Sequence, residues 1–181
     1  MNNNIMIDIE TLDTAPSAKI VSIGAVRFDI VTGELGSRAY QVVSLEDQHD
    51  RTISASTLQW WMKQSDAARS VFNDPNIATL RTVLNGLYDT FQITDRDLIW
   101  GNGATFDNVT LEHAYTQYGM TVPWKFWNNR DVRTLVGFGR DKGIDYRKLV
   151  TPLEGVAHNA LDDAVYQAKY VSALYKELFL K

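Results

Sequence analysis

The sequence predicts an α/β fold in which a mixed β-sheet carries helices on its faces. Three observations support this prediction. The chain opens with three strand-like segments in an antiparallel meander, a further short apolar strand follows at residues 97–100, and helical patterns separate and follow these strands. Strands and helices in this order are typical of a layered mixed domain. At 181 residues the chain has the length of one domain, so we expect a single domain over residues 1–181.

The opening meander consists of predicted strands at residues 5–11, 19–28 and 39–43. These segments are rich in β-branched and aromatic residues, and polar breaks separate them. Residues 31–34 carry turn chemistry, because Gly33 can adopt the positive φ that a tight hairpin requires. Strands joined by such short turns are expected to pair antiparallel.

The polar residues 45–53 are expected to form a loop, and Ser56 is predicted to cap a helix that contains Trp60 and Trp61. Adjacent residues lie about 100° apart around a helix, so the two tryptophans cannot share one face. We expect either Trp60 or Trp61 to pack inward while its neighbour lies on a groove wall, with ordinary packing of both as the alternative. Residues 65–72 are expected to add one or two helical turns.

The middle of the chain alternates between helix and strand. Residues 77–91 place apolar side chains at helical spacing, which predicts an amphipathic helix. The strand at residues 97–100 ends in a glycine turn at residues 101–103, and a helix is expected to run from this turn until Gly119 closes it.

The last third is less regular before its final helix. Residues 126–129 are aromatic and irregular, and residues 131–136 are compatible with a helix. The glycines within residues 137–143 indicate a mobile loop. Residues 160–180 place alanine, valine and leucine on one stripe, which predicts a long terminal helix.

Composition narrows the class of protein. Hydrophobic residues make up 45% and charged residues 22%, as in ordinary globular proteins. No apolar run approaches the roughly 20 residues that span a bilayer. Residues 1–4 lack the basic start and apolar stretch of a signal peptide. We therefore expect a cytoplasmic protein without membrane contact.

The sequence contains no cysteine, which excludes disulfides, thiolate catalysis and cysteine-held metal centres. Any metal must then be held by oxygen or imidazole. The formal net charge of −4 lacks the broad basic footprint of duplex-binding proteins. A nucleic-acid enzyme remains compatible with this charge, because metals at a carboxylate site supply positive charge locally.

Two acids interrupt the first predicted strand. Side chains alternate between the faces of a strand, so Asp8 and Glu10 point to one side while Ile7 and Ile9 point to the other. A buried charge is costly unless it is paired or coordinated. We expect a cation to meet the two carboxylates; the alternative is an edge strand whose second face is wet.

Two further acids lie at predicted helix starts. Asp107 by itself is expected to be a helix cap. In the terminal helix, periodicity places Asp163 on the flank of the apolar stripe and Asp162 nearly opposite, toward solvent. We therefore expect Asp163, and not Asp162, to reach the sheet.

Four carboxylates in one cleft, from Asp8, Glu10, Asp107 and Asp163, would repel one another unless divalent cations compensated them. Ligation by oxygen alone favours Mg²⁺ or Mn²⁺. Two such ions about 4 Å apart can hold the attacking and leaving oxygens of a phosphoryl displacement. His158 suits the role of general base, because an imidazole titrates near neutral pH.

The remaining histidines, His49 and His113, have no acidic partners in the sequence pattern and are expected to be structural.

Together the motifs resemble those of the DEDDh 3′–5′ exonucleases related to proofreading subunits and ribonuclease T. The resemblance covers most of the chain and implies a ribonuclease H-like fold, two bound ions on the four acids, and His158 as general base. Three motifs carry it in order: D-x-E at Asp8 and Glu10, Phe106-Asp107 after the glycine turn, and H-x-x-x-x-D at His158 to Asp163.

Residues 59–69 and 125–134 look like the phage exodeoxyribonuclease A branch, whose cellular relatives include exoribonucleases. The resemblance implies that Thr11 and Leu12 contact the terminal nucleotide. Many members read E-T-T-G at this point, whereas this chain reads E-T-L-D. Phe106 is a candidate base-stacking residue. Core packing is the alternative for these contacts.

The sequence thus predicts a metal-dependent 3′–5′ exonuclease that releases nucleoside 5′-monophosphates from the 3′ ends of single-stranded DNA or RNA, with DNA slightly favoured. The alternatives are a non-catalytic nucleic-acid-binding module, and an exoribonuclease or oligonucleotidase with the same chemistry. Assembly as a homodimer and an origin in a phage or prophage are both compatible with the sequence.

Overall fold

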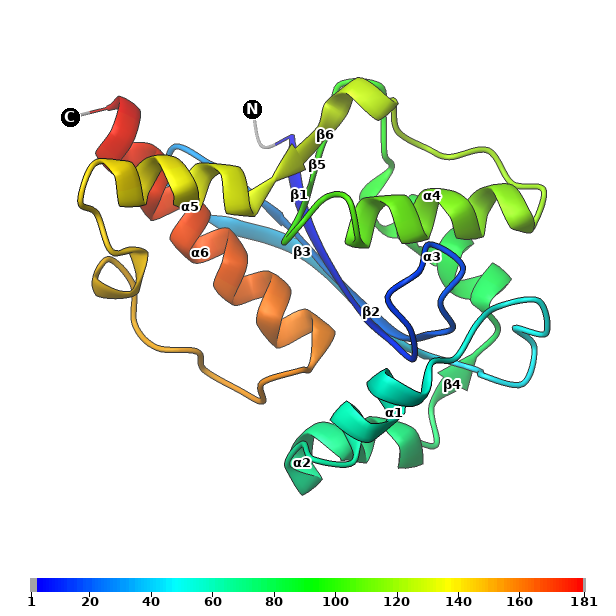
Figure 1. The fold of residues 1–181 in the computed structure, drawn as a ribbon. Coiled ribbons are helices and arrows are strands. Elements are labelled where there is room, and N and C mark those ends of the chain that lie inside the picture. The colour runs from blue at the N-terminus through cyan, green and yellow to red at the C-terminus, as the bar shows by residue number, and fades with distance from the viewer. Residues whose placement is uncertain (1–2, 181) are drawn as a thin grey trace.

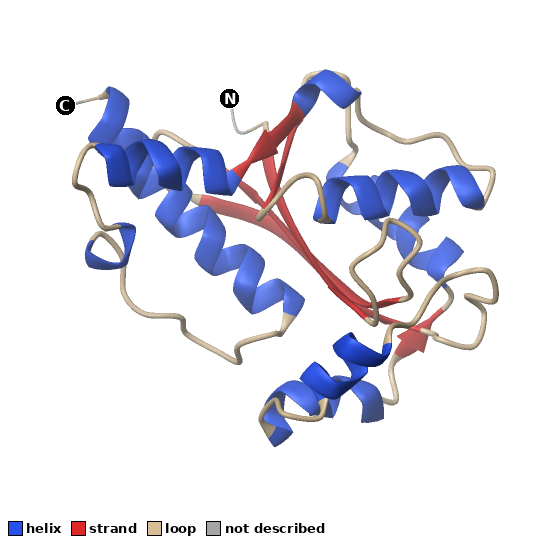
Figure 2. Ribbon diagram, viewed as in Figure 1, coloured by secondary structure: helices blue, strands red, loops and turns tan. Residues whose placement is uncertain are grey.

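The computed structural model describes residues 3–180 and contains a six-stranded sheet with helices on both faces (Figures 1 and 2). Outside the described residues lie Met1, Asn2 and Lys181. The first two belong to residues 1–4, which were interpreted as lacking the features of a signal peptide. The strands are β1 Asn4–Thr11, β2 Ile20–Phe28, β3 Leu35–Val43, β4 Ile77–Ala78, β5 Leu98–Gly101 and β6 Asn129–Asp131.

The strand order is β4-β3-β2-β1-β5-β6. The first three strands form the predicted antiparallel meander. On one side β5 and β6 continue the sheet parallel to β1, and on the other side β4 pairs parallel to β3. The predicted mixed sheet is confirmed.

The helices lie in two layers. Helices α3 and α4 pack on one face, and α5 and α6 pack on the other (Figure 2). No helix within residues 3–180 combines the length and apolar character required to cross a membrane. The helices are α1 Ala55–Trp61, α2 Asp66–Arg69, α3 Leu80–Phe91, α4 Asp107–Gln117, α5 Val132–Asp141 and α6 Ala160–Phe179, and the 3₁₀ turns are η1 Ser70–Asn73, η2 Phe126–Asn128 and η3 Tyr146–Lys148.

The central strand β1 alternates between these two layers. Ile5, Ile7 and Ile9 belong to the cluster under α3 and α4, whereas Met6 belongs to the cluster under α5 and α6. Because alternate residues of a strand share a face, the two acids of β1 lie on the face of Met6. The chemistry-bearing face is therefore the one that α6 covers.

Several predicted boundaries are wrong. The N-cap of α1 is Ser54, whose hydroxyl accepts a backbone N–H, and not Ser56. Helix α3 begins at Leu80 after its cap Thr79, because Ile77–Ala78 pairs with β3 as β4. Here strand pairing at the sheet edge overrides a helical pattern that continues past the cap.

The glycine-rich residues 137–143 are largely helical and not a loop. Helix α5 continues through Gly137 and Gly139 to Asp141. A Cβ on Gly139 would lie 2.7 Å from a methyl carbon of Leu174 in α6. The glycine thus permits close packing of two helices, and glycine content alone could not distinguish this use from flexibility.

Another glycine sets the start of α6. A Cβ on Gly24 of β2 would lie 2.1 Å from the carbonyl carbon of Ala160. Gly24 pairs with Asp8 across the β1/β2 ladder. The bare backbone at this position therefore lets the first turn of α6 reach the sheet beside Asp8.

Gly24→Ala should consequently lower the free energy of unfolding by about 3 kcal/mol, since the added methyl group meets backbone atoms that cannot move aside. The matched control is Gly86→Ala in α3, where an added Cβ meets nothing within 4 Å. That change should stabilise the helix by roughly 0.5–1 kcal/mol. Denaturant unfolding of both variants measures the difference, and equal effects would contradict the proposed contact.

Candidate active site

The first and third sequence motifs meet where α6 approaches β1. Each of Glu10, His158 and Asp163 offers one ligand atom within 4.8 Å of the ligand atoms of the other two. The His158 Nδ1 atom lies 4.0 Å from Glu10 Oε1. The structure therefore places Asp163, the aspartate selected by helical periodicity, beside the acids of β1.

Asp107, the second motif, joins this group from the start of α4. Its side chain is buried, and its Oδ1 accepts the N–H of Ile9, 3.3 Å away, between the two acids of β1. Its Oδ2 is buried without a hydrogen-bond partner among the described residues. An acidic oxygen is thus left without a partner beside Asp8 and Glu10.

Burial and mutual repulsion shift the pKa values of these acids upward. Burial raises the pKa of Glu10 to about 9, with further contributions from Asp163 and Asp107. The pKa of Asp8 is well above its ordinary value, first through burial and then through the neighbouring acids. Burial also raises the pKa of Asp107 to about 7. The cluster favours a compensating positive charge, whether protons or a cation.

The donor set fits a divalent cation. The converging groups are carboxylate oxygens and one imidazole, and the Asp107 Oδ2 atom lacks a partner that an ion would supply. Oxygen donors of this kind suit Mg²⁺ or Mn²⁺.

His158 is held in position by its backbone. It precedes α6 with φ of 67°, a left-handed conformation that is uncommon for residues other than glycine. Its N–H donates to Asp163 Oδ2 at 2.9 Å, and its ring packs edge-on against Trp60 with centroids 4.8 Å apart. These contacts orient the imidazole toward Glu10.

The tryptophan pair divides as predicted. Trp61 is buried, and its Nε1 donates to the carbonyl of Thr11 at 2.8 Å. Trp60 is 40% exposed and lies on the wall of a groove. The sequence predicted one inward and one outward ring. The tertiary contacts identify Trp61 as the inward ring and Trp60 as the outward one.

That groove has a volume of about 360 Å³ and runs beside the acids between α1 and the start of α4. Thr11 and Phe106, two of the expected substrate contacts, line it. Leu12 does not line it, because its side chain is buried in a separate core cluster with Trp61. The contact of Leu12 with a nucleotide stays a prediction.

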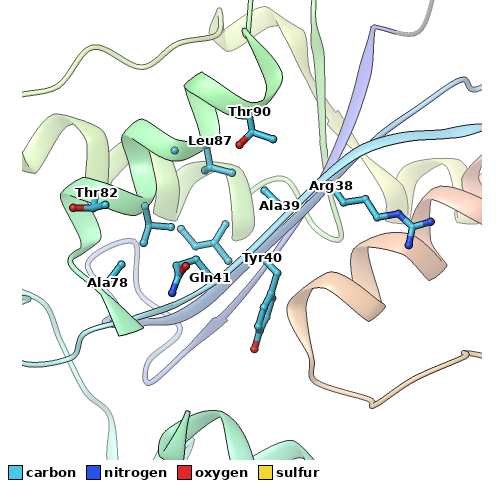
Figure 3. Close-up of a pocket in the computed structure, with 11 residues that line it drawn as sticks. Arg38, Ala39, Tyr40, Gln41, Ala78, Thr82, Leu87 and Thr90 are labelled. Carbon is cyan, nitrogen blue, oxygen red and sulfur yellow. The ribbon is translucent and has the colours of Figure 1, made fainter. Parts of the chain in front are cut away.

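A second groove, of about 350 Å³, lies between β3 and α3 (Figure 3). Ala39 and Gln41 face α3 across it, whereas Arg38 and Tyr40 point away. None of its lining residues carries a carboxylate. It is distinct from the acidic cluster.

Gln167 was not among the predicted site residues, although it contacts Asp8 directly. This buried residue of α6 donates from Nε2 to Asp8 Oδ1 at 2.8 Å. It follows Asp163 by four residues, a spacing that places both side chains on one helix face. That spacing was the signal that could have found it.

Gln167→Met should lower kcat about tenfold while the protein remains folded, since Asp8 loses the donor that orients its carboxylate. Gln117→Met is the matched control, because the Gln117 side chain contacts Arg51 and Asp50 instead of the acids. Steady-state kinetics on a labelled single strand compares the two. Equal activities of the two variants would contradict a positioning role for Gln167.

Asp162 also differs from expectation. It is half-buried, and its Oδ2 accepts the N–H of Val156 at 2.9 Å. It therefore fastens the segment before His158 to α6 and does not simply point into solvent.

Known proteins resemble this chain in sequence and in fold. The family model described as a 3′–5′ exoribonuclease Rv2179c-like domain matches residues 3–175. The chain belongs to this family. Membership of the Rv2179c-like family confirms the predicted enzyme class, a 3′–5′ exonuclease.

An exodeoxyribonuclease of Enterobacteria phage T4 is 26% identical over 160 residues, which cover 74% of this chain and 70% of the phage protein. This similarity agrees with the predicted phage branch.

Solved structures place the Rv2179c-like chain in the ribonuclease H-like fold, as predicted. The zinc-bound complex of E. coli exonuclease I with single-stranded DNA has a TM-score of 0.69 at 17% identity and matches 98% of this chain. This chain spans only 41% of that protein. The nuclease domain of 3′hExo, a DEDDh family member bound to rAMP, has a TM-score of 0.64 at 14% identity over 96% of this chain and 92% of that domain. These similarities confirm the predicted fold, and the family match together with the phage relative agrees with the predicted 3′–5′ exonuclease superfamily.

Proposed function

We propose that this chain, as one domain over residues 1–181, hydrolyses phosphodiester bonds stepwise from the 3′ end of single-stranded nucleic acid and releases nucleoside 5′-monophosphates. The observation that carries the proposal is the convergence of the three motifs beside one groove. Glu10, His158 and Asp163 offer ligand atoms within 4.8 Å of one another, and Asp107 bonds the backbone between the acids of β1.

In this proposal Asp8, Glu10, Asp107 and Asp163 hold two Mg²⁺ or Mn²⁺ ions. Bound divalent ions neutralise phosphate charge and lower the pKa of water. The raised pKa values of Asp8 and Glu10 and the unpartnered Asp107 oxygen support this assignment. The exonuclease I complex also contains a bound divalent ion, zinc, which agrees with this assignment.

His158 is the proposed general base. Its Nδ1 faces Glu10, and its side chain is 38% exposed, so a proton taken from the attacking water can pass on to solvent. Trp60 packs against the ring, and Asp163 fixes the backbone of His158 by accepting its N–H.

The groove is the proposed site of the terminal nucleotide. Its aromatic walls, Trp60 and Phe106, can stack on a base without reading its identity, and Thr11 and Glu10 also line the groove. The exonuclease I complex with single-stranded DNA supports a single strand as substrate.

The relatives differ in the nucleic acid that their names give as substrate. The family is described as an exoribonuclease domain, whereas the phage relative is named an exodeoxyribonuclease. On the resemblance to the phage branch we propose that DNA is cleaved faster. Other parts of the proposed chemistry are the same for both sugars.

A paired time course tests the proposal. Single strands of DNA and RNA, labelled at the 3′ or the 5′ end, are incubated with Mg²⁺, Mn²⁺ or a chelator. The 3′ label should be released at once while the 5′-labelled strand shortens gradually, and the rates decide the sugar. Stable binding without cleavage under every metal would favour the binding module. Cleavage restricted to the shortest strands would favour an oligonucleotidase.

A further inference from the structure

Two large aromatic side chains are exposed beside the β6 edge of the sheet. Phe126 is 75% exposed and Trp127 is 61% exposed, and their rings pack edge-on with centroids 5.0 Å apart. Both lie in η2, the turn that leads into β6 (Figure 1). Adjacent aromatic rings this exposed are more typical of a contact surface than of a free one.

The turn does not depend on these rings for its conformation. The buried Asn128 donates from Nδ2 to the carbonyl of Asp95 at 2.7 Å, and Arg130 donates from Nη1 to the carbonyl of Trp127 at 3.0 Å. The neighbouring Trp124 is buried in the core. Polar contacts therefore fix the backbone, and Phe126 is presented outward.

Cationic side chains flank the aromatic pair in the sequence, and one of them contacts the turn before Asp107. Lys125 is exposed directly before the rings, and Arg130 follows them. The exposed Arg133 donates from Nη2 to the carbonyl of Asn102 at 3.0 Å, in the turn that leads to Asp107. Residues 125–133 carry these three cations and one acid, Asp131, which is a local excess of positive charge in a chain with a formal net charge of −4.

Strand β6 links the aromatic pair, which precedes its first residue, to the turn before Asp107, which lies beside its last residue. Asp131 pairs with Gly101 of β5, and a Cβ on Gly101 would lie 3.0 Å from the Asp107 Cβ. Trp127 precedes Asp131 by four residues, which span at most about 14 Å of chain. A strand whose 3′ end reaches Asp107 can therefore extend to the rings within a few nucleotides.

We propose that Phe126 and Trp127 form a stacking platform for bases upstream of the 3′ end, and that Lys125, Arg130 and Arg133 neutralise the intervening phosphates. This inference rests on the proposed function. Stacking on exposed aromatics combined with backbone cations is the general mode of binding single strands. We infer a single-stranded nucleic acid as the bound partner because the three cations can neutralise its phosphates.

The double variant Phe126→Ala/Trp127→Ala tests the platform, with Phe138→Ala as the control because Phe138 is a 53% exposed aromatic on α5. The substrates are a strand of about 12 nucleotides, within the usual range of single-strand sites, and a dinucleotide too short to reach the rings. For the double variant the ratio of kcat/KM on the long strand to that on the dinucleotide should fall about tenfold through KM, the effect of losing stacked bases. The variant Trp127→Phe should retain most of the ratio.

Binding in a chelator separates this inference from the proposed function. Fluorescence anisotropy with a labelled strand should give a Kd about tenfold higher for the double variant than for the control. The difference in Kd is expected even if the natural protein cleaves no strand. Such a result would refute the proposed nuclease activity and leave the stacking platform standing.

The platform would be overturned if the double variant kept both the kcat/KM ratio and the Kd for the labelled strand. It would also be overturned if kcat/KM fell equally on the long strand and on the dinucleotide. A natural protein that sediments as a dimer and a double variant that sediments as a monomer would overturn it too, since the rings would then bind a second copy. Circular dichroism and thermal unfolding of each variant establish that the compared proteins are folded.

Discussion

Asp8→Asn should lower the rate of hydrolysis about a thousandfold or more, the scale on which loss of a key electrostatic group acts. Asp8 belongs to the proposed ion-holding acids, and its carboxylate is oriented by Gln167. Asparagine keeps the shape and removes the charge, so the protein should remain folded. The time course on a 3′-labelled strand measures the loss. Asp89→Asn, at an exposed position on α3, is the control.

Asp8→Asn should also stabilise the metal-free protein at alkaline pH. Glu10 has a folded-state pKa of about 9 against an ordinary value of 4.5, and Asp8 is raised in the same direction. The folded state therefore holds protons that the unfolded state releases. Stability is fully present below pH 4.5 and is lost as the pH rises through about 9.

Thermal unfolding in a chelator at several pH values measures this loss. The natural protein should lose stability between pH 4.5 and about 9, and Asp8→Asn should lose less because one titrating group is gone. Added Mg²⁺ should restore stability to the natural protein more than to the variant. Full activity in Asp8→Asn, or stabilisation by Mg²⁺ equal in both proteins, would refute the metal assignment.

His158→Asn should lower kcat about a hundredfold to ten-thousandfold, the usual contribution of a general base. Asparagine is chosen because it tolerates the left-handed backbone, here with φ of 67°, better than most residues. Stabilisation by Mg²⁺ should be largely retained, because the four acids remain. His49→Asn, at an exposed position, is the control.

The pH dependence of kcat distinguishes a base from a positioning residue. In the natural protein a general base gives the rate of hydrolysis a pH-dependent limb, and this limb should disappear in His158→Asn. A variant that is slower but keeps the same pH profile would show that His158 acts without transferring the proton. The test needs a fixed excess of metal, because proton release from the acids also depends on pH.

Local patterns predicted the parts of the site that a single element defines. Strand alternation placed Asp8 and Glu10 on one face, and the structure puts both on the side that α6 covers. Helical periodicity selected Asp163 over Asp162, and Asp163 lies with Glu10 and His158. These predictions succeed because side-chain direction within one strand or helix follows from its period.

Predictions that needed a neighbouring element were less reliable. The glycines in residues 137–143 were interpreted as flexible, whereas Gly139 allows α5 to pack against α6. Gln167 was missed although its spacing from Asp163 was visible. In each case the deciding contact comes from a residue far away in the sequence.

The sequence by itself determined the fold class, the order of the motifs and the family to which the chain belongs, because these depend on residue types and on the periods of single elements. Only the tertiary structure decided how the motifs meet. Gly24 lets α6 reach β1 beside Asp8, and the N–H of Ile9 bonds Asp107 from α4. Such contacts depend on the distance between separate elements, which no local period encodes.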